Sequence, residues 1–293
     1  MPIAIIGLGE VGRCYAEALM RADVPVLLCE AEPSRAARDL SARANLPLHP
    51  SVGAWLGEAG WVLSCVAGPQ SSSVLREARR HLRPGAGFGD LTTSRPETKR
   101  EAAREATEAG LHYVDIAVMG AMSLDGVRTP LLAAGEGAGA VRDLLAPLGA
   151  PVRVMQGAAG DAASLKMLRS VFTKGMEALA VELLMAAETQ GVRAQLYEQL
   201  SDIDRTSLPS FLETLVRTHV VHAARRLREV EDAQAELAQQ GVPSLVLNGA
   251  KARFRATTAA LSSDEPREAE PGIEDALQWL LTHASRPATP VAA

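Results

Sequence analysis

The chain has 293 residues, of which 47% are hydrophobic, and a formal net charge of -5 at pH 7. This length can build one large core or two domains of ordinary size. The net negative charge argues against a nucleic-acid partner. The basic cluster at 222–229 does not change this, because acidic residues follow it directly. No apolar run is long enough to span a membrane, and the first residues lead into a glycine motif without a basic start or a cleavage site. We therefore expect a cytoplasmic protein with no membrane partner.

Strand and helix patterns alternate in the first half of the chain. Short apolar runs predict strands, and each run is followed by a stretch with helical periodicity. The predicted strands are 3–9, 25–31 and 61–68, and the predicted helices that follow them are 11–23, 34–44 and 71–82. This alternation is typical of a parallel sheet covered by helices.

Gly7, Gly9 and Gly12 form a G-x-G-x-x-G motif between the first predicted strand and the first predicted helix. In that position the first glycine permits a tight turn, the second lets the backbone approach a pyrophosphate, and the third allows the helix to pack closely on the strand. The N-terminus of the helix also favours an anion. The motif therefore predicts dinucleotide binding.

Glu30 bears on the choice of dinucleotide, because it ends the second predicted strand, eighteen residues after Gly12. An acidic side chain at this place bonds the ribose hydroxyls of NAD. Arg35 or Arg38 could instead reach the 2′-phosphate of NADP. We expect NAD as the cofactor, with NADP less favoured.

The three cysteines are Cys14, Cys29 and Cys65, and they lie in apolar surroundings without the spacing of metal ligands. We interpret them as small buried thiols. The sequence predicts neither a disulfide nor a metal site.

The second half of the chain loses the strand pattern near residue 158. Helical patterns follow at 161–190, 193–201, 207–239, 243–260 and 272–283. We expect a dinucleotide-binding domain at 1–158, an all-helical domain at 159–285 and a flexible tail at 286–293. The polar segment 262–272 contains prolines and many charges, and it predicts a mobile loop.

The first of these helices has an unusual polar face. At about 100° per residue, four polar positions fall within about 60° of one another, while apolar residues occupy the opposite side. The polar positions are Lys166, Ser170, Thr173 and Glu177, with Arg169 and Lys174 beside them, and the apolar ones are Leu168, Val171, Phe172 and Leu179. A solvated face would explain this pattern. A functional face would explain it equally well.

The motifs, taken in order, resemble the β-hydroxyacid dehydrogenases, a family related to 6-phosphogluconate dehydrogenase and 3-hydroxyisobutyrate dehydrogenase. The glycine motif is the first match. GDLTTSRPET at 89–98 is similar to the family's D-x-[ST]-T-x-x-P segment, and VDIAVMGAM at 114–122 to its substrate-binding D-A-P-V-S-G-G segment. GAAGDAASLKMLRS at 157–170 is similar to the turn that leads to the catalytic lysine. The resemblance covers most of the chain and implies a Rossmann doubly wound parallel sheet joined by a long helix to an all-α domain.

The resemblance also implies a set of site residues. It places the catalytic lysine at Lys166, with Ser170 one turn later, and Thr93 near the nicotinamide. The implied cofactor-binding residues are Gly7, Gly9, Glu10, Val11, Gly12, Glu30, Val66, Ala67 and Thr93. The implied substrate-binding residues are Met119, Gly120, Ala121, Arg169 and Arg228.

Lysine suits the chemistry that the resemblance implies. Removing a hydride from a carbinol carbon requires that the hydroxyl proton also leave, so a base must lie within hydrogen-bond reach. Burial and the nearby Arg169 or Lys174 would lower the pKa of Lys166 enough for it to serve.

Several positions depart from the family pattern. Ser170 stands where the family has asparagine, and Ala117, Met119 and Ala121 replace the proline, a serine and a glycine of the substrate motif. The lysine–aspartate pair that often completes the pocket corresponds loosely to Arg228 and Glu229, with His222, Arg225 or Arg226 as alternatives. These features resemble a divergent, phosphogluconate dehydrogenase-like branch, and they leave the substrate open.

We therefore expect an NAD-dependent dehydrogenase or reductase that acts on a small, anionic β-hydroxy compound. The alternatives are an imine reductase of similar fold and a dinucleotide-binding protein without catalysis. Lys166 counts against the imine reductase, whose chemistry usually lacks the lysine, while the altered substrate motif counts slightly for it. The abundance of apolar helices also predicts a homodimer formed through the C-terminal domain.

Overall fold

A computed structural model describes residues 1–266 and 268–284 of the chain. The chain divides into two compact units, Met1–Val171 and a helical unit that begins at Phe172. The predicted tail at 286–293 lies outside the described residues, and the predicted loop at 262–272 has neither helix nor strand where it is described. Within the described part of the chain, every helix is too short or too polar to cross a membrane.

The first unit is built on one eight-stranded sheet with the strand order β3-β2-β1-β4-β5-β6-β7-β8. The order reverses between β1 and β4, which is the switch point where open α/β sheets bind ligands at the carboxyl ends of their strands. Every pair of neighbouring strands is parallel except β6 and β7. The strands are β1 (Ile3–Ile6), β2 (Val26–Cys29), β3 (Leu48–His49), β4 (Trp61–Ser64), β5 (Gly87–Asp90), β6 (His112–Val118), β7 (Leu131–Ala134) and β8 (Val152–Val154).

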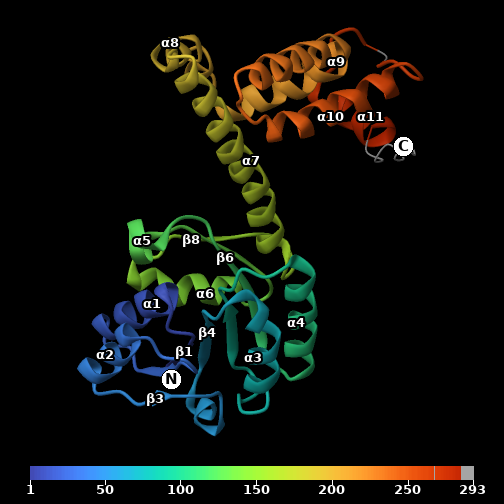
Figure 1. The fold of residues 1–293 in the computed structure, drawn as a ribbon. Coiled ribbons are helices and arrows are strands. Elements are labelled where there is room, and N and C mark those ends of the chain that lie inside the picture. Colours follow the sequence, from blue (N-terminus) through green and yellow to red (C-terminus); the bar gives the residue numbers. More distant parts are fainter. Residues whose placement is uncertain (267, 285–293) are drawn as a thin grey trace, which may run out of the picture. The chain divides into compact units, whose positions relative to one another are not determined.

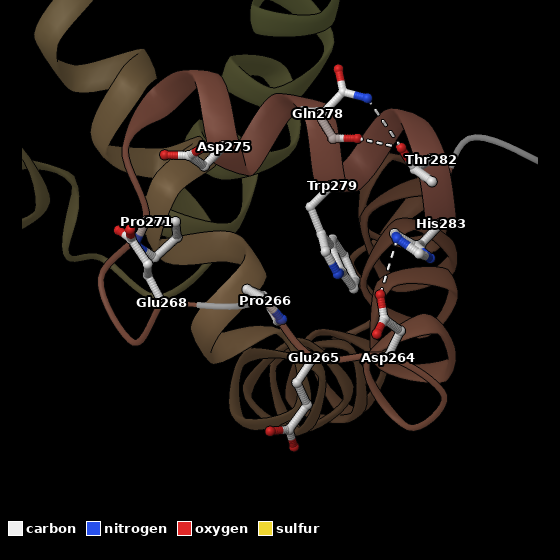
Figure 2. Close-up of a pocket in the computed structure, with 10 residues that line it drawn as sticks. All are labelled: Asp264, Glu265, Pro266, Glu268, Pro271, Asp275, Gln278, Trp279, Thr282 and His283. Carbon is white, nitrogen blue, oxygen red and sulfur yellow. Dashed lines mark hydrogen bonds and ion pairs between the residues drawn. The ribbon is translucent and has the colours of Figure 1, made fainter.

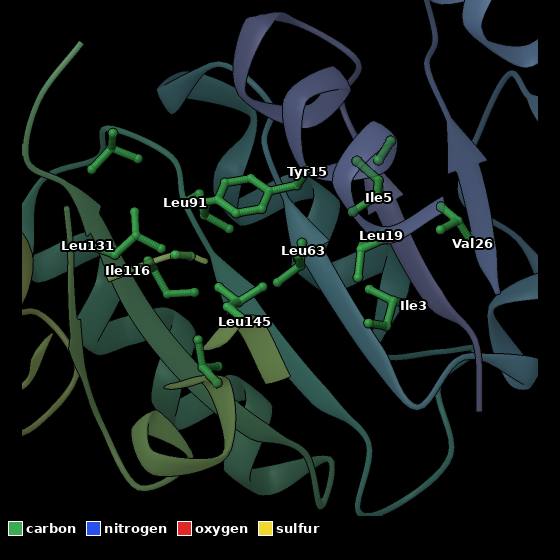
Figure 3. Packing of buried hydrophobic residues seen from close by; sticks show 14 of the residues in the cluster. Ile3, Ile5, Tyr15, Leu19, Val26, Leu63, Leu91, Ile116, Leu131 and Leu145 are labelled. Carbon is green, nitrogen blue, oxygen red and sulfur yellow. The ribbon is translucent and has the colours of Figure 1, made fainter. Parts of the chain in front are cut away.

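Helices cover both faces of this sheet (Figure 1). They are α1 (Glu10–Arg21), α2 (Arg35–Ala44), α3 (Ser71–Ala78), α4 (Pro96–Glu108), α5 (Met122–Asp125) and α6 (Ala138–Leu145). Short 3₁₀ turns occupy Ala54–Glu58, Gly68–Gln70, Gly126–Arg128 and Ala146–Leu148. Strand side chains alternate between the two faces, so that Ile3 and Ile5 pack with α1, α2 and α6 (Figure 3), whereas Ala4 and Ile6 pack with α3 and α4.

The second unit has helices and no strand among its described residues. Its elements are the second part of α7 (Asp161–Thr189), α8 (Arg193–Gln199), a 3₁₀ turn at Ile203–Arg205, α9 (Leu208–Gln239), α10 (Leu245–Leu261) and α11 (Ile273–His283). Helix α9 packs along both α10 and α11. Val220, Ala276 and Trp279 form part of the small buried core where α9 and α11 meet.

The predicted fold class is confirmed, and each helix named in the sequence analysis is present to within a few residues. Strands β1, β2 and β4 were predicted, whereas β3, β5, β6, β8 and the reversed strand β7 were not. The boundary between the two compact units falls after Val171, inside α7, because the first turns of that helix belong to the sheet unit. Lys166 and Ser170 are therefore part of the same unit as the glycine motif.

Candidate active site

The glycine motif forms a turn that only glycine can make at two of its positions. Gly7 has φ +91°, and a Cβ built on it would lie 2.7 Å from the carbonyl carbon of Cys65. A Cβ on Gly12 would lie 1.8 Å from the carbonyl oxygen of Gly7, because α1 packs directly on the end of β1. A Cβ on Gly9 would meet no atom within 4 Å. The turn is thus tightly packed at Gly7 and Gly12, whereas the space beside Gly9 is free of protein atoms.

This geometry fits the pyrophosphate of a dinucleotide. Gly9 is the N-cap of α1 and supplies no side chain to cap it, so the first backbone N–H groups of the helix stay available to an anion. A cavity of about 490 Å³ lies beside the turn at the ends of β1, β2 and β4. Its lining includes Gly7, Glu30, Val66, Gln70 and Ser73. A nucleoside has both the size and the polar groups to fill such a space.

Glu30 is held at this cavity by the glycine turn. Its Oε2 accepts a hydrogen bond of 2.6 Å from the backbone N–H of Leu8, and its Oε1 accepts one from Glu32. The two competing arginines have other partners: Arg35 lies 3.7 Å from Asp39, and Arg38 donates to the carbonyl oxygen of Pro33. The Glu30 carboxylate therefore lines the cavity in a fixed orientation.

A second cavity, of about 280 Å³, lies where the loop after β5 meets the start of α7. Lys166 enters it from α7, and its Nζ donates a hydrogen bond of 3.0 Å to Thr93 Oγ1. Ser170 also lines the cavity, and its hydroxyl donates to the Lys166 carbonyl oxygen. The lining is otherwise largely apolar, with Ile116, Ala117 and Met167, and Arg95 brings a further cation.

The start of α7 is anchored to the sheet by Asp115, which lies in β6. Asp115 Oδ2 accepts hydrogen bonds from the N–H groups of Gly160 (3.0 Å) and Ala163 (2.8 Å), two of the donors that a helix N-terminus leaves unpaired. Gly160 has φ +100°, and a Cβ there would lie 2.8 Å from the carbonyl oxygen of Pro96. The turn before α7 therefore needs its glycine, and it fixes the direction in which Lys166 points.

A buried charge cluster lies beneath the cavity, and the sequence analysis missed it. Lys99 of α4 is fully buried, with its Nζ 3.0 Å from Asp90 Oδ1 and 3.5 Å from Asp115 Oδ1. Burial opposes ionisation of Asp90, but Lys99 and the hydrogen bonds from Tyr113, Thr92 and Ser71 outweigh it and lower the pKa of this carboxyl. The sequence signal for this cluster was a lysine on the apolar face of α4, at helical spacing from Ala102 and Ala106.

The pKa of Lys166 is lowered, as the sequence analysis expected, but for a partly different reason. Burial is the main cause, and the like charge of Lys99 adds to it, while Asp115 acts in the opposite direction. The expected contribution of Arg169 or Lys174 is absent from these causes, because Lys174 pairs with Glu177 and Arg169 does not line the cavity. The cation that lowers this pKa is Lys99, which lies in α4.

The predicted substrate motif lies at the end of β6. The Met119 backbone N–H donates to the Pro130 carbonyl oxygen, so it continues the β6–β7 ladder. Gly120 is exposed, and Ala121 caps the short helix α5. These residues do not line the cavity at Lys166, whereas Ala117 of the same strand does.

The remaining predicted substrate residues lie elsewhere. Arg169 is exposed on α7. Arg228 is exposed on α9 in the helical unit, near Arg225, which pairs with Glu229, and Arg226, which donates to Thr218. Their predicted contact with a substrate anion stays a prediction.

The cysteines offer no reactive thiol at either cavity. Burial, with a smaller contribution from Glu30, raises the pKa of Cys29 to about 11, and burial likewise raises the pKa of Cys14 and Cys65. All three are free thiols. Within residues 1–266 and 268–284, no group of three His, Cys, Asp or Glu side chains is placed to hold a metal ion.

A separate cavity of about 550 Å³ lies in the helical unit, between α11 and the segment before it (Figure 2). Its lining carries carboxylates at Asp264, Glu265 and Asp275, and His283 Nε2 lies 3.1 Å from Asp264 Oδ2. The described residues that line it include neither a glycine turn nor a lysine. The chemistry of hydride transfer is thus better matched by the cavity at Lys166.

Together, the Rossmann-type sheet, the glycine turn and the lysine cavity define a dinucleotide-binding oxidoreductase. A family model described as the NAD binding domain of 6-phosphogluconate dehydrogenase matches residues 2–157. The chain belongs to this family, and the predicted resemblance is confirmed. A domain of unknown function matches residues 187–257, which agrees with a divergent branch.

Similar proteins cover nearly the whole chain. A curated, uncharacterized 28.5 kDa protein of Methanothermus fervidus is 21% identical over 255 residues, which are 87% of this chain and 98% of that protein. A solved hypothetical protein of Sinorhizobium meliloti is 28% identical, with coverage of 97% and 96% and a TM-score of 0.59. An imine reductase variant of Myxococcus stipitatus, in complex with NAD⁺, has the same fold at 16% identity, with coverage of 95% and 99% and a TM-score of 0.75.

Proposed function

We propose that the protein transfers a hydride between NAD(H) and the CH–OH or carbonyl group of a small, anionic β-hydroxy compound, with Lys166 as the general acid/base. The observation that carries this proposal is the position of Lys166. Its Nζ enters a cavity at the end of β5, beside the predicted nicotinamide residue Thr93, and its pKa is lowered. Arg95, which lines the same cavity, is suited to hold an anionic group.

Lys166 would move the proton that accompanies the hydride. The bound nicotinamide supplies the hydride acceptor or donor. In the oxidation, neutral Lys166 takes the hydroxyl proton on Nζ as the carbonyl forms, and in the reduction the ammonium returns a proton to the carbonyl oxygen. Thr93 accepts one N–H of the amine, which leaves the others free to face the substrate.

The pH dependence follows from the direction of the shift. Oxidation needs the neutral amine, so its rate should rise with pH through the pKa of Lys166 and level off above it. Reduction needs the ammonium, so its rate should fall across the same range. Because burial and Lys99 lower this pKa, both changes should begin at a lower pH than for an exposed lysine.

Replacing Lys166 tests the assignment. Lys166→Met keeps most of the apolar stem and removes the proton donor, so kcat should fall by about 10²–10⁴-fold while NADH still binds. Ser170→Ala should have a milder effect, because its hydroxyl donates to the helix backbone. A Lys166→Met enzyme with more than about a tenth of the wild-type kcat, and with chemistry rate-limiting, would remove Lys166 from the proton transfer.

An imine reductase is the second candidate. The largely apolar lining at Ile116, Ala117 and Met167 would accept an uncharged cyclic imine, and the substrate motif is altered at Met119 and Ala121. A scan of NADH oxidation with oxo acids, aldehydes and cyclic imines separates the two reactions. No turnover with any of them, despite tight NADH binding, would favour a dinucleotide-binding protein without catalysis.

We further propose that NAD(H) is preferred over NADP(H) and that the chain forms a homodimer. The first proposal is supported by the fixed carboxylate of Glu30 and by the other partners of Arg35 and Arg38. The second is supported by the apolar side chains that α7 leaves exposed, among them Val171, Val181 and Met185.

A further inference from the structure

Lys99 lies beneath the reaction cavity and has no part in the proton transfer proposed for Lys166. It is 0% exposed, on the face of α4 that also buries Ala102 and Ala106. A lysine is almost never fully buried unless its charge is paired, because an isolated ammonium loses its hydration. The partners of Lys99 therefore indicate why a lysine occupies this place.

The partners are two carboxylates on neighbouring strands. Asp90 ends β5 and lies in register with Asp115 of β6. Lys99 Nζ lies 3.0 Å from Asp90 Oδ1 and 3.5 Å from Asp115 Oδ1, and it also donates to the Asp90 carbonyl oxygen at 2.8 Å. Two buried carboxylates so close together would repel each other if no cation lay between them.

Each carboxylate holds one of the two segments that build the reaction cavity. Asp90 Oδ1 accepts the N–H of Thr92 at 2.9 Å, which fixes the loop that carries Thr93. Asp115 Oδ2 accepts the N–H groups at the start of α7, one turn before Lys166. The Lys166–Thr93 hydrogen bond joins these two segments directly. The Lys99 ammonium connects the same two segments through Asp90 and Asp115.

We propose that Lys99 is a positioning residue: by pairing with Asp90 and Asp115, it holds Thr93 and Lys166 in the arrangement that the reaction needs. This inference rests on the proposed role of Lys166. The charged groups that face Lys166 are Lys99 from α4, Asp115 from β6 and Arg95 from the start of α4. Removing Lys99 takes away a like charge, so Lys166 should lose its proton at a higher pH.

The test measures the protonation of Lys166 without any substrate. The wild type and Lys99→Met are labelled with a trace of acetic anhydride across a pH series, and acetylation of Lys166 is quantified by peptide mass spectrometry. Lys99→Met should move the midpoint of Lys166 labelling upward by about 1 pH unit. Arg104→Met is the matched control, since it removes a cation from the exposed side of the same helix, and it should leave the midpoint unchanged.

Further variants keep the test decisive. An unchanged midpoint in a Lys99→Met protein that still folds and binds NADH would overturn the inference. If Lys99→Met does not fold, Asp115→Asn decides, because it removes the charge that favours the ammonium and should move the midpoint downward; no shift would overturn the inference. Once a substrate is found, Lys99→Met should lower kcat at least tenfold with little change in NADH affinity, and Lys99→Arg should restore part of it. If the midpoints shift but Lys166→Met remains active, the proposed function fails while the coupling stands.

Discussion

Glu30, which we propose binds the cofactor, has its carboxylate oriented by the backbone around it. The N–H of Leu8 fixes Oε2 at 2.6 Å and the N–H of Glu32 holds Oε1. Each carboxylate oxygen has a second lone pair, so the group can still accept hydrogen bonds from ribose hydroxyls. The same negative charge would repel a 2′-phosphate.

Glu30→Ala should therefore narrow the preference for NADH. Losing a charge-assisted hydrogen bond costs about 1.5–3 kcal/mol, so NADH should bind at least tenfold more weakly, whereas NADPH should bind as well as before or better. Calorimetric titration with both cofactors measures the two dissociation constants. Glu32→Ala, which removes an exposed neighbouring carboxylate, is the control. Tighter NADPH than NADH binding by the wild type would contradict the proposed preference.

At the scale of single elements, the turn between β1 and α1 contains one glycine that helix packing requires and one that matters only for the proposed cofactor site. Gly12 is pressed against Gly7, whereas Gly9 faces open space in the protein alone. Both are glycines of one motif, yet only one of them is required for packing.

Two alanine variants should reveal this difference. Gly12→Ala brings a methyl group against a backbone oxygen, so it should lower the melting temperature by several degrees and weaken NADH binding as well. Gly9→Ala should leave the melting temperature of the protein alone nearly unchanged but weaken NADH binding strongly, because its methyl group would occupy the place of the pyrophosphate. Thermal unfolding with and without NADH measures both effects. Equal loss of stability in the two variants would be inconsistent with this assignment.

The elements that sequence could predict are those set by local pattern. The glycine motif, the strands β1, β2 and β4 and the ends of α7 and α9 depend on residues close together in the chain, and all were predicted. The pairing of Lys99 with Asp90 and Asp115 was not, because it joins α4 to two strands and depends on the tertiary fold. Burial was expected as a cause of the Lys166 pKa shift, but the contribution of a neighbouring cation was assigned to the wrong residues for the same reason. Sequence offers only the neighbours along a helix, while electrostatics depends on neighbours in space.

At the scale of the whole molecule, the helical unit leaves much apolar surface to water. Val181 and Met185 of α7 are at least half exposed. Apolar surface of this extent is rare on proteins that stay monomeric. In the proposed homodimer, a second copy of the chain would cover this surface.

The dimer can be tested by placing a charge on α7. Val181→Glu should shift the protein from dimer to monomer in sedimentation velocity at micromolar concentration, because a carboxylate would be buried without a partner in the contact. Leu124→Glu is the matched control, since Leu124 of α5 is 82% exposed in the sheet unit. A wild type that sediments as a monomer would refute the proposed assembly.

The buried cluster of Lys99, Asp90 and Asp115 also constrains how this protein can evolve. Removing Lys99 leaves two buried carboxylates without a cation, and an unpaired buried charge destabilises a protein by about 3–5 kcal/mol, a large part of the stability of an ordinary domain. A change at Lys99 alone is thus strongly selected against, whereas a change at Lys99 that is accompanied by loss of the carboxylates can pass. Across a lineage the three positions should change together, even though they lie on one helix and two strands.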